Sequence, residues 1–280
     1  MKLQTITLVT GSNLNNMLKE IGIESLDLSK SEHYTLSIRL STGGFCFYIY
    51  NPLDDSFSLI EERGIEPSLS LTANLRRILG KTNYLKYKFK KINILLTESR
   101  YTLIPLELFD DKYSSDVFYY NQVPVENELV RYTVLMNSNT VAVYGVDKSA
   151  YQFLETLFPD ANYVSYVVPL LEYFSTKSRL GNTNKVYAHW ASGVLTVFCY
   201  EKGKLVLVNS FHAKVIADCV YYVLYVWKQL SFNQLRDELH LCGDLLQKEK
   251  LTATFKKYVS EVYIMNPFEN LDLQKISVCE

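Results

Sequence analysis

Two stretches of the chain, 36–50 and 186–200, share one alternation of apolar and polar positions. Written without gaps, LSIRLSTGGFCFYIY lies over VYAHWASGVLTVFCY, and both runs are interrupted by a turn of small residues. Alternation with a period of two predicts strands, and a small-residue turn between two such runs predicts a β-hairpin. The sequence therefore predicts two similar hairpins, one in each half of the chain.

The elements expected after each hairpin are also similar. After the first hairpin the pattern predicts a strand, a helix and a strand, at 56–62, 69–79 and 91–98. After the second it predicts a strand, a helix, a strand, a helix and a strand, at 204–211, 215–230, 238–243, 250–259 and 261–267. A meander of three strands followed by alternating helices and strands predicts a mixed sheet with helices packed on it. Because the arrangement occurs twice, we expect a duplicated protein of two similar lobes.

The segment between the two copies has its own pattern. Residues 129–179 predict two strands joined by an Asn-Ser-Asn turn, then a helix, a strand and a helix, with Asp147 as the N-cap of the first helix. The polar and aromatic stretch 110–128 predicts a surface helix or insertion that could bind a partner. We expect an N-terminal lobe of residues 1–180, in which 110–180 is inserted or linking, and a C-terminal lobe of 181–280, with a hinge or boundary near Asn182.

Composition excludes several classes of protein. The 29 basic and 30 acidic side chains nearly cancel, so the chain has no overall attraction for nucleic acid or anionic membranes. Five widely spaced cysteines without a CxxC pair indicate neither a disulfide framework nor a zinc ribbon.

The N-terminus does not read as a signal peptide. The segment 215–230 is too short to cross a bilayer and carries Asp218, and its apolar circumference predicts a helix buried on several sides. We expect a cytoplasmic protein with no membrane span.

The order and spacing of these elements, over residues 32–267, resemble the actin-like ATPase superfamily with its ribonuclease H-like fold. The segment TVAVYGVDKSAYQFLETLFPDANYVSYVVPLLEYFS, before the second hairpin, is most similar to the cell-division and pilus-assembly actin-like branch. The chain also resembles a family of uncharacterised Bacteroidetes proteins of that fold. The resemblance implies an α/β protein of two similar lobes, each a mixed β-sheet with packed helices.

The resemblance also implies where a nucleotide would bind. In the superfamily each hairpin carries Asp-x-Gly, whose carboxylate holds water on Mg²⁺ while backbone amides face the phosphates. The matching Asp positions fall at Arg39 and His189 or, with a slip of two residues, at Ser41 and Ala191. Neither register supplies a carboxylate, and arginine cannot ligate magnesium. We therefore expect no catalytic residue and no required cofactor.

The turns nevertheless keep small residues that define a candidate vestigial nucleotide or anion site: Ser41, Thr42, Gly43, Gly44, Ser192, Gly193 and Gly243. Their amides and hydroxyls could hold an anion. A plain hairpin turn is the simpler interpretation of Gly43 and Gly44. Gly243 falls at the family's adenosine-contacting Gly-Gly turn, where Asp244 replaces the second glycine. We interpret Asp244 as the cap of the next helix.

Two further groups carry weaker signals. His189, Cys199, His240 and Cys242 fall on neighbouring predicted strands but lack the usual spacing of metal ligands, so metal and thiol chemistry are disfavoured and no metal site is predicted. Lys81–Lys91 interleaves lysines with aromatic residues, as single-stranded nucleic acid would require. Since the stretch leads into an apolar strand, we interpret it as a solvated strand edge, which disfavours nucleic-acid binding.

The sequence thus favours a non-catalytic protein of the actin-like fold that acts as a binding or assembly component with a protein partner. The alternative is a nucleotide-binding ATPase or phosphotransferase with a rebuilt site, using ATP and Mg²⁺.

Overall fold

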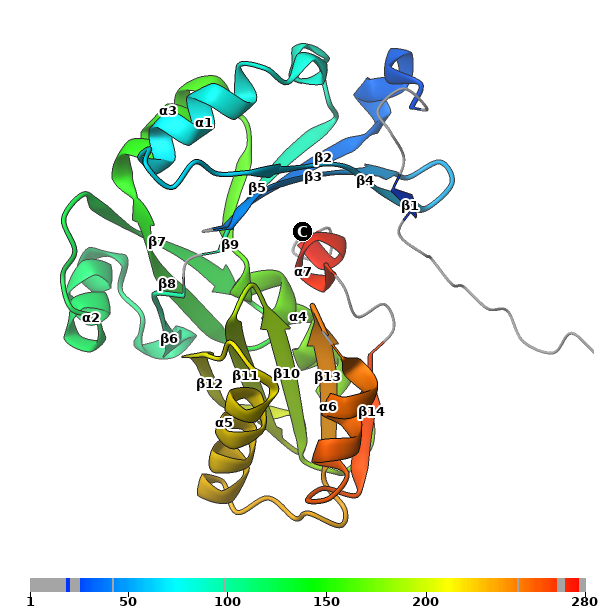
Figure 1. Cartoon of the computed structure of the whole chain (residues 1–280). Coiled ribbons are helices and arrows are strands. Elements are labelled where there is room, and N and C mark those ends of the chain that lie inside the picture. Colours follow the sequence, from blue (N-terminus) through cyan, green and yellow to red (C-terminus); the bar gives the residue numbers. More distant parts are fainter. Residues whose placement is uncertain are drawn as a thin grey trace, which may run out of the picture.

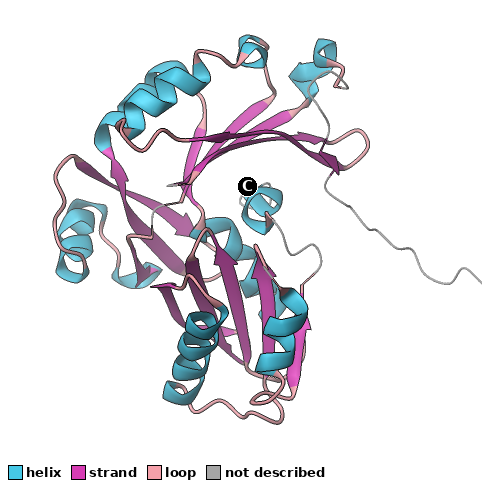
Figure 2. Ribbon diagram, in the orientation of Figure 1, coloured by secondary structure: helices cyan, strands magenta, loops and turns pink. Residues whose placement is uncertain are grey.

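The computed structural model describes residues 19–20, 26–41, 43–97, 99–245, 247–265 and 270–276. Two sheet-bearing halves face each other, and α7 (Leu271–Lys275) lies between them (Figure 1). Helices cover the outer faces of both halves (Figure 2). The mixed α/β architecture of two lobes is the one expected from the sequence.

The first sheet has the strand order β1-β4-β3-β2-β5-β9. Its strands are β1 (Lys19–Glu20), β2 (Thr35–Ser41), β3 (Gly44–Asn51), β4 (Ser56–Gly64), β5 (Lys91–Leu96) and β9 (Asn162–Ser165). β2 and β3 form the first predicted hairpin, with Leu36 opposite Ile49 and Ser41 opposite Gly44. β5 runs parallel to both β2 and β9, so it is an interior strand.

The second sheet has the order β12-β11-β10-β13-β14. Its strands are β10 (Lys185–Ala191), β11 (Val194–Glu201), β12 (Lys204–His212), β13 (Glu238–Gly243) and β14 (Glu261–Ile264). Position by position, this order repeats β4-β3-β2-β5-β9 of the first sheet: an antiparallel meander, then two parallel strands. The predicted duplication is confirmed at the level of sheet topology.

A third, smaller sheet has the order β6-β8-β7, from β6 (Tyr101–Pro105), β7 (Glu128–Leu135) and β8 (Thr140–Asp147). The Asn-Ser-Asn turn joins β7 to β8 as predicted, but the sequence reading missed β6. β6 is only five residues long and ends at Pro105. Its buried positions, the first and the fourth, do not alternate with exposed ones, so no period of two marks it as a strand. The segment 110–180, expected to be inserted or linking, therefore contributes to two sheets. Its strands β7 and β8 belong to the small sheet, whereas β9 belongs to the first sheet.

Two of the helices, α1 (Leu71–Leu79) and α3 (Lys148–Leu157), begin at side-chain caps that the sequence supplies. The other helices are α2 (Ser114–Asn121), α4 (Val167–Ser178), α5 (Ile216–Gln229), α6 (Lys248–Phe255) and α7, with short 3-10 helices η2 (Leu28–His33), η3 (Asn83–Lys86), η4 (Leu106–Leu108) and η5 (Asp111–Tyr113). Asp147 caps α3 as predicted, its Oδ1 accepting a hydrogen bond of 2.7 Å from the Ala150 amide. Ser70 caps α1 in the same way.

The second sheet lies between two hydrophobic cores, because alternate side chains of its strands point to opposite faces. Along β11, Leu195 and Val197 pack into a core shared with α5 and α6, whereas Phe198 and Tyr200 face the opposite core. That opposite core is continuous with the first sheet and includes α4 and α7. The two lobes are therefore joined by one buried apolar layer, and its members include Ile38, Ile94, Phe174, Tyr187 and Leu271.

Two expectations about exposure are wrong. α5 buries one face, through Cys219, Val223 and Trp227, but Tyr221 is 62% exposed. The cause is that tyrosine counts as apolar in the sequence pattern yet keeps its hydroxyl in water. The Lys81–Lys91 stretch does not protect a strand edge, because it leads into the interior strand β5.

Candidate functional site

The turns of the two predicted hairpins face one space between the lobes. Ser41, Gly43 and Gly44 from the first turn and Ser192 from the second all line a polar hollow of about 520 Å³. Asp244, which follows Gly243 at the end of β13, lines it as well. Of the candidate site residues, Thr42 lies outside the described residues.

The first turn is closed on itself. The Ser41 hydroxyl accepts a hydrogen bond of 3.1 Å from the Gly44 amide and donates one of 2.9 Å to the Gly44 carbonyl. The Ser41 hydroxyl and the Gly44 amide, two of the groups that could face an anion, are thereby bonded within the turn. Anion binding at this turn stays a prediction, and it would require the anion to displace these bonds.

The second turn has the geometry of a tight hairpin. Ser192 and Gly193 both adopt positive φ, at 50° and 75°, as a two-residue turn of type I′ requires. The Ser192 amide donates to Asp244 Oδ2 at 3.2 Å. An amide suited to an anion is thus bonded to a carboxylate of the chain itself.

This contact corrects the interpretation of Asp244. The residue at the N-cap of α6 is Gln247, which makes no side-chain capping bond, so Asp244 does not cap that helix. Gly243 explains why the chain turns here. Its φ is 98°, and a side chain at this position would collide with the Trp190 carbonyl of the neighbouring strand.

The position expected to carry the first magnesium ligand instead carries a cation. Arg39 on β2 pairs with Asp272 on α7, with 3.2 Å between Nη1 and Oδ1. Arg39 also donates to Cys46 Sγ. The sequence reading did not single out Asp272, because a five-residue helix gives too short a pattern to recognise.

His189 occupies the second expected position and is fully enclosed. Burial lowers its pKa, because the charged imidazolium loses its hydration, while the Asp272 and Asp244 carboxylates oppose this effect. It lines a cavity of about 50 Å³ next to Tyr166 and Thr196. The Tyr166 hydroxyl lies 2.7 Å from Thr196 Oγ1, which in turn lies 2.9 Å from Ser210 Oγ. A hydroxyl network therefore joins the two lobes beside the hairpins.

The histidines and cysteines of the second sheet do not form a common site. His240 Nε2 lies 2.8 Å from Glu238, whereas Cys242 contacts the Ala188 carbonyl. Burial raises the pKa values of the Cys199 and Cys242 thiols, which keeps both thiols protonated. Among the residues that the structure describes, no three His, Cys, Asp or Glu side chains gather as metal ligands would.

The two surface candidates differ in outcome. In Lys81–Lys91, Tyr84 and Phe89 are buried in the core of the first lobe, which leaves only Tyr87 among the aromatic residues exposed for base stacking. The stretch 110–128 contains the surface helix α2, as expected, and exposes Tyr120 and Val123. Its role in binding a partner stays a prediction.

Comparison with known families now places the chain. A family model described as "Protein of unknown function (DUF3822)" matches residues 23–262. The chain belongs to this family. A solved structure from Bacteroides thetaiotaomicron VPI-5482, a protein with actin-like ATPase fold and unknown function, is 48% identical, with a TM-score of 0.85 over 91% of this chain and 99% of that one. This DUF3822 member therefore has the actin-like ATPase fold, as the sequence resemblance implied.

Two more distant solved structures are similar to this chain at low sequence identity. A chain from the PilM-PilN type IV pilus biogenesis complex is 10% identical, with a TM-score of 0.51 over 88% of this chain and 93% of that one. The ethanolamine utilization protein EutJ from Carboxydothermus hydrogenoformans is 9% identical, with a TM-score of 0.45 over 88% and 90%. Comparison with curated proteins gave no match. In the described part of this DUF3822 chain, none of the helices has the length and apolar character needed to cross a membrane.

Proposed function

We propose that this protein is a non-catalytic member of the actin-like fold and acts as a binding or assembly component for a protein partner. The observation that carries the proposal is the Arg39–Asp272 pair. The Arg39 guanidinium lies where the actin-like ATPase superfamily carries its magnesium-anchoring carboxylate. The Asp272 carboxylate on α7 balances the charge of this guanidinium. Since phosphoryl transfer relies on positioning and charge stabilisation, losing the metal anchor removes much of the catalysis.

The way the hairpin turns are bonded supports the same proposal. Ser41 is bonded to Gly44, and the Ser192 amide is bonded to Asp244. A nucleotide phosphate would have to displace both contacts and would meet the negative charge of Asp244. The fold itself is compatible with assembly, since a chain of this fold occurs in the PilM-PilN complex.

The experiment measures thermal unfolding of the purified protein with and without millimolar ATP and Mg²⁺, together with release of phosphate. A ligand that binds only the folded state raises the melting temperature by mass action. We expect no rise and no release. In parallel, cross-linking in the native cell followed by mass spectrometry should identify one reproducible protein partner.

The second candidate is a nucleotide-dependent enzyme with a rebuilt site, and one observation favours it. Asp272 and Asp244 bring carboxylates to the hairpin turns from outside the hairpins. This candidate predicts Mg²⁺-dependent hydrolysis by the wild type that Asp244→Asn abolishes, although asparagine can still accept the Ser192 amide bond, and that Asp27→Asn, at an exposed site, leaves intact. Such a result would overturn the non-catalytic proposal.

A further inference from the structure

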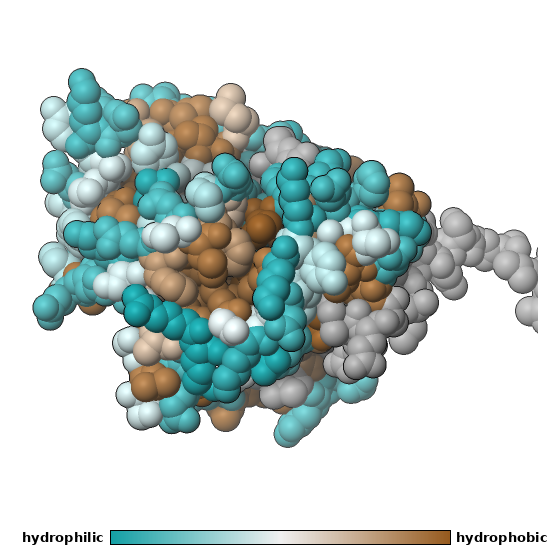
Figure 3. Space-filling model, turned by 90° about the horizontal axis from the view of Figure 1, so that it is seen from above, coloured by the Kyte–Doolittle hydropathy of each residue, from teal (hydrophilic) through white to brown (hydrophobic). Residues whose placement is uncertain are grey.

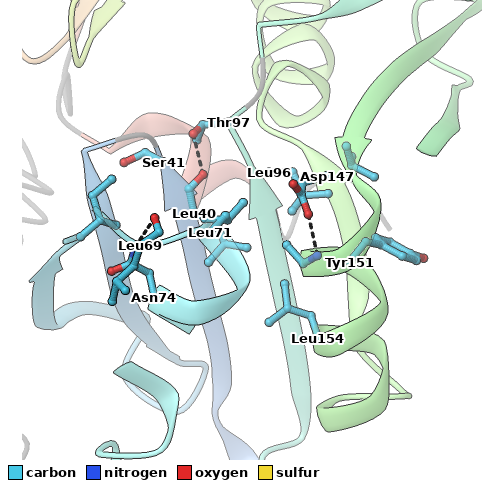
Figure 4. Close-up of a pocket in the computed structure, with 13 residues that line it drawn as sticks. Leu40, Ser41, Leu69, Leu71, Asn74, Leu96, Thr97, Asp147, Tyr151 and Leu154 are labelled. Atoms are coloured by element: carbon cyan, nitrogen blue, oxygen red, sulfur yellow. Dashed lines mark hydrogen bonds between the residues drawn. The ribbon is translucent and has the colours of Figure 1, made fainter. Parts of the chain in front are cut away.

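A further cavity lies in the first lobe, beside the inter-lobe site. Its volume is about 280 Å³, and it is bounded by β2, β5, α1, the end of β8 and α3 (Figure 4). Leu71 from α1 and Leu154 from α3 point into the same space, with Leu40 and Leu96 from the sheet beside them (Figure 4). Ala150, a small residue in the first turn of α3, leaves room where a larger side chain would fill it.

The place of the cavity in the fold favours a ligand. Leu96 is the last residue of β5, and Leu40 comes just before the end of the neighbouring parallel strand β2. Open α/β sheets bind ligands at the carboxyl ends of their parallel strands. The cavity is partly open to solvent, and its volume approaches the lower end of the range of small-molecule sites, about 300–1,000 Å³.

The polar side chains that line the cavity are already bonded within the chain. Asn74 donates to the carbonyls of Glu66 and Leu69, and Asp147 accepts from Ala150 and Asn127. A ligand with buried polar groups would therefore lose its hydrogen bonds to water and gain few in return. The part of the ligand inside the cavity must be apolar.

The walls of the cavity are mainly aliphatic, which an aliphatic ligand matches. The lining is mainly leucine, isoleucine and valine, with Tyr151 as its one aromatic residue. That ring contacts Tyr163 and the Arg131 guanidinium. Since a cavity of roughly 150 Å³ holds one benzene molecule, this one holds about ten carbon atoms.

The opening toward the inter-lobe site accommodates a polar end. Ser41 and Thr97 line both this cavity and the 50 Å³ cavity that contains His189. Thr97 Oγ1 donates to the Leu40 carbonyl at 2.5 Å, and a hydroxyl oxygen that donates can still accept a bond. From above, the molecule shows apolar surface framed by hydrophilic side chains (Figure 3).

We propose that this cavity binds an aliphatic chain of about ten carbons whose small polar head is a hydrogen-bond donor such as a hydroxyl, with the head at Ser41 and Thr97. The cavity shares Ser41 with the first hairpin turn, but none of its lining residues belongs to the Arg39–Asp272 pair that carries the proposed function.

The test measures binding of 1-hexanol, 1-octanol, 1-decanol, 1-tetradecanol and decanoate to the full chain, below their aggregation concentrations, by calorimetry and thermal unfolding. Affinity should rise about fourfold per methylene, as the transfer free energy of one CH₂ predicts, and stop rising near ten carbons. An affinity that continues to rise to fourteen carbons indicates non-specific surface binding and overturns the proposal, as does absence of binding by 1-decanol. Decanoate should bind more weakly than 1-decanol, because its carboxylate only accepts hydrogen bonds and both hydroxyl protons are already donated within the chain. Tighter binding of decanoate contradicts the position of the head.

Two variants locate the site. Ala150→Leu fills the cavity and should weaken 1-decanol binding at least tenfold, whereas Gln152→Leu adds the same side chain on the exposed side of α3 and should leave binding unchanged. If Ala150→Leu does not fold, methyl NMR of the wild type with labelled leucine decides. Contacts from 1-decanol to the methyl groups of Leu40, Leu96 and Leu154 support the site, and contacts elsewhere overturn it.

Discussion

Arg39 on β2 and Asp272 on α7 form a largely buried ion pair that links the first hairpin to the C-terminal helix. Their side chains are 14% and 2% exposed, and Nη1 lies 3.2 Å from Oδ1. Leu271 and Leu273 on either side of Asp272 are buried in the core that the two lobes share. The pair therefore holds α7 in the space between the sheets, next to the hairpin turns.

The first prediction concerns this pair. Asp272→Asn should lower the free energy of unfolding by about 3–5 kcal/mol, because it leaves the Arg39 guanidinium buried without a counter-charge. Arg39→Met combined with Asp272→Leu should be less destabilising than either single change. Urea unfolding followed by circular dichroism measures each difference.

The control is an exposed pair of the same type. Lys30 and Asp27 are 3.1 Å apart, with side chains 58% and 52% exposed, and Asp27→Asn should change stability by less than about 1 kcal/mol. Equal effects of Asp27→Asn and Asp272→Asn would show that burial does not determine the strength of the Arg39–Asp272 contact.

Local pattern was sufficient to predict the repeated parts of the fold. The alternation at 36–50 and 186–200 gives both hairpins, and Asp147 before a helical pattern gives the start of α3. Contacts distant in the sequence were not accessible in this way. No local pattern indicates that Asp272 meets Arg39 or that Asp244 bonds to Ser192, because each depends on how separate elements pack. The exposure of Tyr221 shows that apolar periodicity does not distinguish buried from exposed tyrosine.

The second prediction tests the close approach at Gly243. Gly243→Ala should destabilise the protein by roughly 1–3 kcal/mol, because φ of 98° disfavours a side chain and the new methyl group would meet the Trp190 carbonyl. Gly64→Ala is the matched control, since a side chain there has no atom within 4 Å, and its effect should stay within about 1 kcal/mol. The comparison requires thermal unfolding of both variants. A neutral effect of Gly243→Ala would contradict the close approach of Gly243 to the Trp190 carbonyl.

The third prediction concerns thiol reactivity. Cys46, Cys199, Cys219 and Cys242 are free and buried. Burial raises the pKa of Cys46 to about 11 and that of Cys219 to about 12, so little reactive thiolate exists at pH 8. Iodoacetamide at this pH should leave all four unmodified in the native protein and modify them in urea, as read by peptide mass spectrometry. Rapid native modification of Cys242 would contradict its burial and revive thiol chemistry at the second sheet.

The fourth prediction is a loss of stability on acidification that depends on His189. Burial lowers the pKa of His189, whereas in the unfolded chain the imidazole titrates near its ordinary value of 6.5. Between the lowered folded value and 6.5 the unfolded state binds more protons, so stability is full above pH 6.5 and falls as the pH decreases. The slope from one such group is at most about 1.4 kcal/mol per pH unit.

Urea midpoints at pH 7.5, 6.5 and 5.5 should fall less steeply in His189→Gln than in the wild type, with a residual slope from His240, whose pKa burial also lowers. Identical slopes in the two proteins would mean that the pKa of His189 is the same in the folded and unfolded states, and a steeper fall in His189→Gln would mean that folding raises this pKa through Asp272 or Asp244. Either result contradicts the prediction.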